Sequence, residues 1–185
     1  MPCRGFPLPQ DAVNQWGKKM LSLLSFKSEP KFAKAMSFQT YLGWEQEFFV
    51  ISAEHYRARP DLINCGRTLI GKKPTKNQQG DLNYFGPVPG SVARLMENIQ
   101  AVMFSVGCPC NVMHNEVAPA QHEMSPIFCT ASASSDYNVL FMEIGAAEAK
   151  KLGLHILYHE KPFAGINGSG KHANWSAGTD TGESP

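Results

Sequence analysis

Apolar and polar positions along the chain predict alternating strands and helices from about residue 39 onward. Gln39–Ile51 is rich in aromatic and β-branched residues, a composition typical of a strand. Apolar side chains between Val92 and Val106 recur with a period near 3.6, which predicts a core-packing helix from Ser91 to about Gly107. The pattern therefore favours a domain that contains both element types.

Two further strands are predicted just after that helix. Asn111–Val117 and Gln121–Phe128 are separated only by Ala118-Pro119-Ala120. A connection this short places the two strands side by side in the predicted sheet.

The last part of the chain predicts a second helix and a fourth strand. Asp136 can cap a helix that runs to about Leu152 and ends at Gly153. Leu154–Glu160 has the composition of a strand and precedes a Gly-, Asn- and Ser-rich loop over 165–170. From there the sequence is polar as far as residue 185.

Two segments lie outside this regular pattern. Ala12–Phe26 predicts a short amphipathic helix that a Ser-, Lys- and Pro-containing linker follows, so residues 1–38 are expected to be separate from a domain over 39–185. Ala58–Pro89 is punctuated by Gly, Pro and Asn and predicts a long loop. Loops of this length in compact domains are usually functional.

Composition excludes several classes of partner. With 185 residues, 43% hydrophobic residues and a net charge of +1, the chain suits a globular domain without the basic field that nucleic acids or anionic membranes attract. No apolar run reaches the 18 residues that a membrane helix needs. The five scattered cysteines fit a reducing compartment, so we expect the cytoplasm, with an organelle as the alternative because residues 1–38 are lysine-rich.

Two glutamates lie close together in the first predicted strand. Glu45 and Glu47 are two residues apart, so they point to the same face of a strand and repel one another. An isolated pair of this kind is more often on a solvated outer face. The apolar and aromatic residues on both sides instead favour a largely buried strand, in which carboxylates need nearby cations.

Two more acids flank the predicted hairpin. Glu116 and Glu123 lie on its two strands, so four carboxylates can converge. Hard cations such as Mg²⁺ or Mn²⁺ prefer oxygen ligands of this kind. Taken alone, either acid is more often an ordinary surface residue, and the Cys108-Pro109-Cys110 pair is more often incidental than a metal site.

A glycine-rich loop ends at a histidine. Asn167-Gly168-Ser169-Gly170-Lys171-His172 lets backbone groups approach a ligand closely, but it lacks the spacing of a Walker loop. His172 alone is more often a structural histidine than a ligand.

Together, these three segments resemble the signature of the glutamine synthetase superfamily. The matching stretches are Glu45-Gln46-Glu47, then Asn115-Glu116-Val117-Ala118-Pro119-Ala120-Gln121-His122-Glu123, then Lys161 through His172 with Asn174-Trp175-Ser176 after it. Lys171, Asn174-Trp175-Ser176 and Gly66-Arg67-Thr68-Leu69 favour the type III form. The resemblance covers about residues 41–182, and it implies an α/β (α+β) catalytic domain with a curved, mainly antiparallel sheet backed by helices.

The resemblance also implies roles for individual residues. Glu47, Glu116 and Glu123 would hold one divalent cation, and Glu45 and His172 a second one near the nucleotide phosphates. The positions of Asn167 and Gly168 belong to the glutamate-binding site, and those of Asn174 and Ser176 lie near the nucleotide. Asn174 stands where many members have histidine. No residue is assigned as a nucleophile.

The implied activity is the ATP-dependent ligation of ammonia to glutamate through γ-glutamyl phosphate, with Mg²⁺ or Mn²⁺, in a homo-oligomeric ring. The family's later glutamate and arginines would lie beyond Pro185, so the chain is expected to be an incomplete catalytic domain that is weakly active or inactive alone. Two alternatives stay open at this point. They are a γ-glutamyl ligase that uses another amine, and a truncated or non-catalytic relative.

Overall fold

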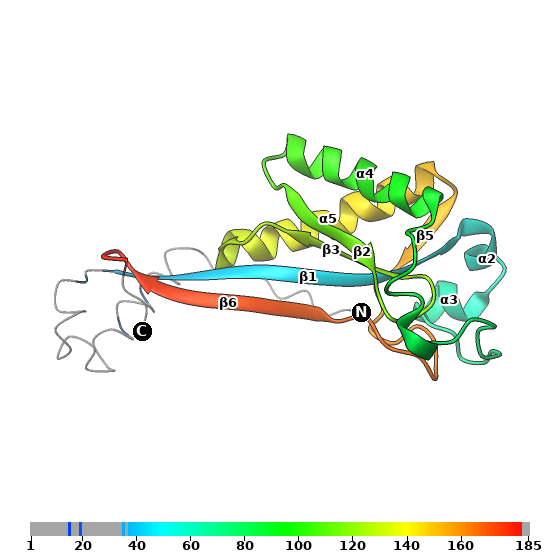
Figure 1. Cartoon of the computed structure of the whole chain (residues 1–185). Coiled ribbons are helices and arrows are strands. Elements are labelled where there is room, and N and C mark those ends of the chain that lie inside the picture. The colour runs from blue at the N-terminus through cyan, green and yellow to red at the C-terminus, as the bar shows by residue number, and fades with distance from the viewer. Residues whose placement is uncertain (1–14, 16–18, 20–34, 36, 183–185) are drawn as a thin grey trace.

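The computed structural model describes residues 15, 19, 35 and 37–182. It shows an open sheet of six strands with its two long helices on one side (Figure 1). The strands are β1 (Phe38–Ser52), β2 (Cys110–Asn115), β3 (Gln121–Pro126), β4 (Cys129–Thr130), β5 (Leu154–Leu157) and β6 (Lys171–Thr179). All of their pairings are antiparallel, which confirms the expected fold class.

Strand β1 is the centre of the sheet. One of its edges pairs with β3 and β4, and the other pairs with β5 and β6. Strand β2 extends the sheet beyond β3 as the expected hairpin. Strands β1 and β6 run together as a long ribbon that projects away from the helices (Figure 1).

The helices α4 (Gly90–Ser105) and α5 (Ala131–Lys151) cover one face of the sheet. Even-numbered residues of β1 point to this face, where Phe48 packs near Phe141 with ring centroids 6.1 Å apart. Met124 of β3 belongs to the same buried cluster. Because side chains alternate along a strand, the odd-numbered residues of β1 must point to the opposite face.

The opposite face is only partly covered. Phe49 packs there in a second, smaller buried cluster whose other members are Leu62, Ala118, Leu157 and Ile166. These residues come from loops and short elements, not from a long helix. Glu45 and Glu47 lie on the same face, beyond the end of this cluster.

Helix α5 begins earlier than the sequence indicates. Its first residue is Ala131, with Thr130 at the cap position, so Asp136 lies inside the helix and is not its cap. Serines in the first turns are poor helix formers, which is why the sequence favours a later start. In the structure Ser134 and Asn138 are buried, and Ser135 Oγ donates to the carbonyl of Ala131 at 3.0 Å.

The predicted long loop contains short helices. These are α3 (Pro60–Cys65) and the 3₁₀ turn η3 (Gln79–Asp81), and the short helix α2 (Ala53–Arg57) lies just before the loop. Arg59 holds Asp61 through two hydrogen bonds of 2.6 and 2.9 Å, and Asp61 also accepts from the amide of Leu69. These contacts lower the pKa of Asp61 well below its usual range.

Other boundaries also differ from the prediction. Strand β6 replaces what the sequence predicts only as a polar stretch, and β5 ends at Leu157, three residues before the predicted end. Apart from Gln15 and Lys19, the predicted helix Ala12–Phe26 lies outside the described residues. Within the described part of the chain, no helix is both long and apolar enough to cross a membrane.

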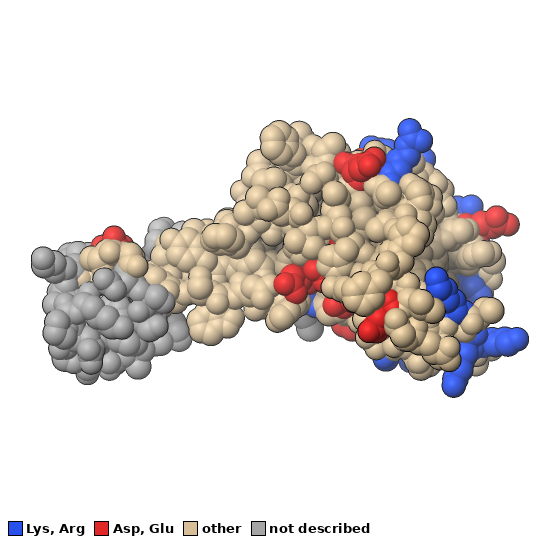
Figure 2. All heavy atoms as spheres, in the orientation of Figure 1, with Lys and Arg blue, Asp and Glu red and all other residues tan. Residues whose placement is uncertain are grey.

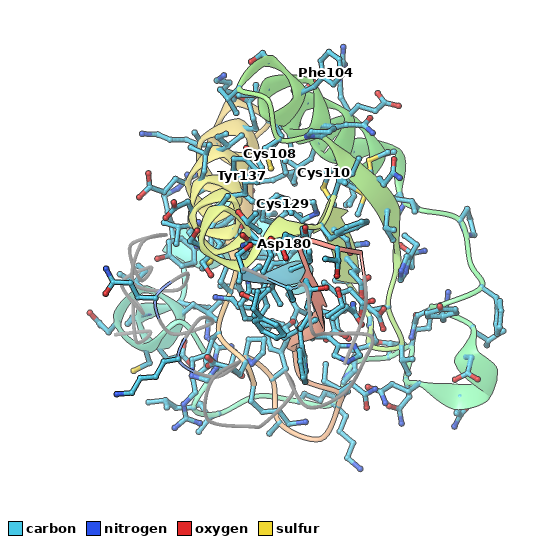
Figure 3. The ribbon with its side chains drawn as sticks, turned by 90° about the vertical axis from the view of Figure 1, so that its left-hand side faces the viewer. Phe104, Cys108, Cys110, Cys129, Tyr137 and Asp180 are labelled. Carbon is cyan, nitrogen blue, oxygen red and sulfur yellow. The ribbon has the colours of Figure 1, made fainter. Side chains whose placement is uncertain are left out.

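The Cys-Pro-Cys pair belongs to the core. Cys108 and Cys110 are buried in the cluster beneath α4 and α5, and Figure 3 shows them near Cys129 below α4. Burial raises the pKa of Cys108 to about 11 and that of Cys110 to about 12. The thiols therefore stay protonated near neutral pH, in contrast to the thiolates that bind metals.

Candidate metal centre

Strand register brings the predicted site residues onto one face of the sheet. Glu47 of β1 lies directly opposite Glu123 of β3, and Glu45 lies directly opposite His172 of β6. Residues opposite one another in an antiparallel pair point to the same side. This face is the one that the long helices leave uncovered.

Glu45 is held by two side chains of β6. Its carboxylate oxygens lie 2.9 Å from His172 Nδ1 and 2.8 Å from Asn174 Nδ2. His172, Asn174 and Ser176 follow one another at every second position, so all three share the face of Glu45. These contacts place an imidazole and a carboxylate together at an exposed edge of the site.

Glu47 is held by the glycine-rich loop. Its carboxylate accepts from the amide of Gly170 at 2.6 Å and from Gln121 Nε2 at 3.3 Å. In return, the amide of Glu47 donates to the carbonyl of Gly170 at 3.2 Å. The loop that precedes β6 is thus fixed directly to the central strand.

Glu116 and Glu123 complete the carboxylate cluster from the β2–β3 hairpin. Glu123 is buried, and its Oε1 lies 3.5 Å from His114 Nε2. Glu116 Oε1 lies 3.7 Å from His114 Nδ1. Ligand atoms of His114, Glu116 and Glu123 all lie within 4.8 Å of one another, which is a spacing that one metal ion can span.

The electrostatics of the cluster are unfavourable without a cation. Burial and the charges of Glu47 and Glu123 raise the pKa of Glu116 to about 7. Burial also raises the pKa of Glu123, with repulsion from Glu45 and Glu47 adding to it and His114 opposing it. Figure 2 shows acidic side chains gathered near the middle of the molecule. A divalent cation would relieve this repulsion, so the donor set fits Mg²⁺ or Mn²⁺.

Asn167 and Gly168 lie in the loop that ends at Gly170. Asn167 makes two hydrogen bonds with the side chain of Gln78, of 2.6 and 3.0 Å. The carbonyl of Gly168 accepts from Gln121 Nε2 at 2.8 Å. A Cβ atom at Gly168 would lie 2.3 Å from the carbonyl oxygen of Glu160, so only glycine fits there.

Ser176 lies farther along β6, opposite Tyr41 of β1. It lines a shallow hollow with Tyr41, Leu42 and Phe128, and Asn174 lies in the same hollow. Four residues of strand separate Ser176 from His172, or about 13 Å. The structure thus brings Glu45, Glu47, Glu116, Glu123 and His172 together, and places Ser176 at a distance along the same face.

Comparison with known proteins decides the family. The family model described as glutamine synthetase, catalytic domain, matches residues 26–184. The chain belongs to the glutamine synthetase family. The type-3 glutamine synthetase of Dictyostelium discoideum is 50% identical over 141 residues, which are 76% of this chain and 19% of that protein. This match confirms the resemblance to the type III form.

A second relative agrees with the family assignment, and a solved structure agrees with the fold. The glutamine synthetase of Butyrivibrio fibrisolvens is 41% identical over 172 residues, which are 93% of this chain and 24% of that protein. The solved glutamine synthetase of Plasmodium falciparum has a TM-score of 0.57 at 22% identity, and the match covers 83% of this chain and 32% of that one. It supports the fold alone. The chain spans about a fifth to a quarter of the length of these curated relatives.

Three residues near the candidate site have no role that the sequence alone predicts. Gln121 joins Glu47 to Gly168, and Gln78 holds Asn167 from the long loop. His114 lies between Glu116 and Glu123. Only His114 has a sequence signal, because it is two residues before Glu116 at the end of a predicted strand. Gln78 has none, since its contact spans 89 positions.

Proposed function

We propose that this chain provides a two-cation site of a glutamine synthetase that joins ammonia to glutamate with ATP. The observation that carries the proposal is the gathering of four carboxylates and one imidazole on the uncovered face of the sheet. Membership of the glutamine synthetase family supports the choice of reaction. The mutual repulsion of the acids supports the choice of divalent cations as cofactors.

Glu47, Glu116 and Glu123 would hold one Mg²⁺ or Mn²⁺, and Glu45 and His172 would hold the other. The hydrogen bonds from Gly170 and Gln121 orient Glu47, and the one from Asn174 orients Glu45. When bound, the two cations neutralise charge on phosphate oxygens and hold the phosphoryl donor and acceptor in line.

The proposed reaction needs no protein nucleophile. The side-chain carboxylate of glutamate attacks the γ-phosphorus of ATP and ADP departs, so γ-glutamyl phosphate forms. Ammonia then attacks the activated carbonyl, phosphate leaves, and glutamine is released. We assign the loop at Asn167 and Gly168 to the binding of glutamate, and Asn174 and Ser176 to the surface near the nucleotide. Neither Ser169 nor any cysteine is needed as an attacking group.

The whole enzyme's activity and its assembly are part of the same proposal. The chain spans less than a quarter of the length of the two curated relatives described above, so we propose that turnover requires further segments and assembly into a homo-oligomeric ring. In that case the isolated chain binds cations but is weakly active or inactive, because losing one well-placed transition-state donor already costs about 100–1000-fold in rate.

A Mn²⁺ titration tests the metal centre. The wild-type chain should bind Mn²⁺ reversibly, with release by EDTA, and Glu47→Ala should weaken binding by at least about tenfold because it removes a ligand. Glu54→Ala, at an exposed position on α2, is the matched control and should bind like wild type. Equal binding by wild type and Glu47→Ala would remove the basis for the site.

A further inference from the structure

His114 occupies a position between two of the proposed ligands. It lies on β2 directly opposite Glu123 of β3, so both side chains point to the uncovered face. Its Nε2 lies 3.5 Å from Glu123 Oε1, and its ring is half-buried, with a side-chain exposure of 34%. Tyr84 packs against it edge to face at 5.5 Å between ring centroids. The ring is therefore held in place from two sides.

One ring nitrogen of His114 already has a partner. Nδ1 lies 2.7 Å from the backbone carbonyl oxygen of Asn115. A carbonyl oxygen only accepts hydrogen bonds, so Nδ1 must carry the hydrogen and donate it. In the neutral imidazole this leaves Nε2 with an unshared electron pair.

That electron pair faces a carboxylate. The Nε2–Oε1 distance of 3.5 Å is longer than an ordinary N–H···O hydrogen bond, so the two groups are near one another without being bonded. A positive centre between two electron-rich atoms at this distance makes the contact favourable, and either a metal ion or a proton on Nε2 can supply it. Metal-binding histidines commonly show this arrangement, in which the second nitrogen donates to a backbone carbonyl and fixes the tautomer.

We propose that His114 Nε2 is a further ligand of the cation held by Glu116 and Glu123. This inference rests on the proposed function and extends its ligand set. The spacing fits, because an ion about 2.1 Å from both Nε2 and Glu123 Oε1 would make a nitrogen–metal–oxygen angle of about 110°. Glu116 lies beside the same ring, with its Oε1 3.7 Å from Nδ1, and one ligand atom from each of the three residues lies within 4.8 Å of the others.

An imidazole ligand changes which metal the site prefers. Nitrogen donors bind first-row transition ions better than they bind Mg²⁺. Mg²⁺ instead favours sites whose ligands are all oxygen atoms. His114 should therefore increase the affinity for Mn²⁺ more than the affinity for Mg²⁺. A merely structural histidine would change both affinities alike.

The first test compares Mn²⁺ and Mg²⁺ binding by the wild-type chain, His114→Gln and His55→Gln. His55 is exposed on α2 and provides the same chemical change away from the site. We expect His114→Gln to weaken Mn²⁺ binding by about tenfold or more and Mg²⁺ binding by a smaller factor, while His55→Gln matches wild type. If the wild type binds no Mn²⁺, the proposed function fails and this inference with it. If the wild type binds Mn²⁺ and His114→Gln binds it equally, only the role of His114 is overturned.

A second measurement does not depend on the folding of the His114 variant. His172→Gln, at an exposed position on β6, removes the other proposed imidazole ligand. Pulsed EPR of Mn²⁺ bound to this variant should still detect coupling to one imidazole ¹⁴N nucleus, which comes from His114. Bound Mn²⁺ without nitrogen coupling would overturn the proposal.

Discussion

The surroundings of single side chains in this sheet depend on the residue that lies opposite them on the neighbouring strand. Glu47 and Glu123 are both acids and lie directly opposite one another, an arrangement that destabilises a sheet when nothing neutralises it. His122, the neighbour of Glu123, points to the other face, where it is buried and its Nδ1 donates to Asn115 Oδ1 at 2.9 Å. His122 therefore belongs to the core, while Glu123, its neighbour on the same strand, belongs to the candidate metal centre.

The buried position of His122 predicts a pH effect on stability. Burial lowers its pKa to about 4, whereas the unfolded chain has a pKa near 6.5. As the pH falls from about 6.5 to about 4, the unfolded state takes up a proton that the folded state does not, so the folded state loses stability. The loss attributable to His122 should be about 3 kcal/mol.

Urea unfolding of wild type and His122→Asn at several pH values measures this effect. The variant is less stable at pH 7 but should lose less free energy of unfolding on acidification, because it has no imidazole to protonate. Comparing the two proteins cancels the titration of the glutamates, which they share. Parallel pH profiles would show that His122 does not titrate as described.

At the scale of elements, the loop before β6 connects distant parts of the chain. Its glycines let the backbone pass close to Glu160 and to Glu47, and hydrogen bonds with Gln78 and Gln121 fix it. The site on β1 is therefore supported by residues from the long loop, the hairpin and this glycine-rich segment. Displacement of the segment should disturb Glu47 directly.

Gly168→Ala should displace this segment. The added methyl group would lie 2.3 Å from the carbonyl oxygen of Glu160, so the backbone must shift at an expected cost of about 1–3 kcal/mol. Mn²⁺ binding should weaken together with stability, because Gly170 would no longer donate well to Glu47. Gly71→Ala is the control, since nothing lies within 4 Å of its added Cβ. Thermal unfolding and Mn²⁺ titration of both variants check the prediction, and a Gly168→Ala protein like wild type would contradict it.

Sequence reasoning is most successful where local pattern and structure agree. The aromatic and β-branched run of β1 and the apolar period of α4 predict both elements, and three ordered motifs predict which acids meet. Strand β6 escapes prediction because its first six residues are exposed and show no buried apolar alternation, and it is a strand because β1 pairs with it. Gln78 and His114 could not be placed because their contacts depend on tertiary structure.

For the molecule as a whole, the two faces of the sheet differ in what covers them. Helices α4 and α5 bury one face and provide most of the core, while the other face carries the acids and is bordered by loops. The core thus lies on the side away from the candidate metal centre. We therefore expect substitutions of the site residues to change cation binding more than they change folding.

The activity of the isolated chain tests the proposal at this scale. A γ-glutamyl hydroxamate assay on the chain should give little or no product. A chimera in which residues 39–185 replace the matching segment of the type-3 relative should be active, and Glu47→Ala in the chimera should lose at least about 100-fold in rate. Robust turnover by the isolated chain would contradict the requirement for further segments. Comparing ammonia with polyamines as acceptors in the chimera separates glutamine formation from ligation to another amine.

The alternation of side chains along β1 also limits how its length can vary. Inserting one residue just before Glu45 would leave the composition of β1 almost unchanged. Every following side chain would nevertheless move to the other face of the sheet if the pairing with β3 and β6 stayed in place. Phe48 would then leave the cluster beneath α5 for the opposite face, and both acids would turn toward α5. Substitutions at the exposed end of the strand are mild by comparison. We therefore expect functional relatives to differ there in residue type, but not by insertions or deletions of an odd number of residues.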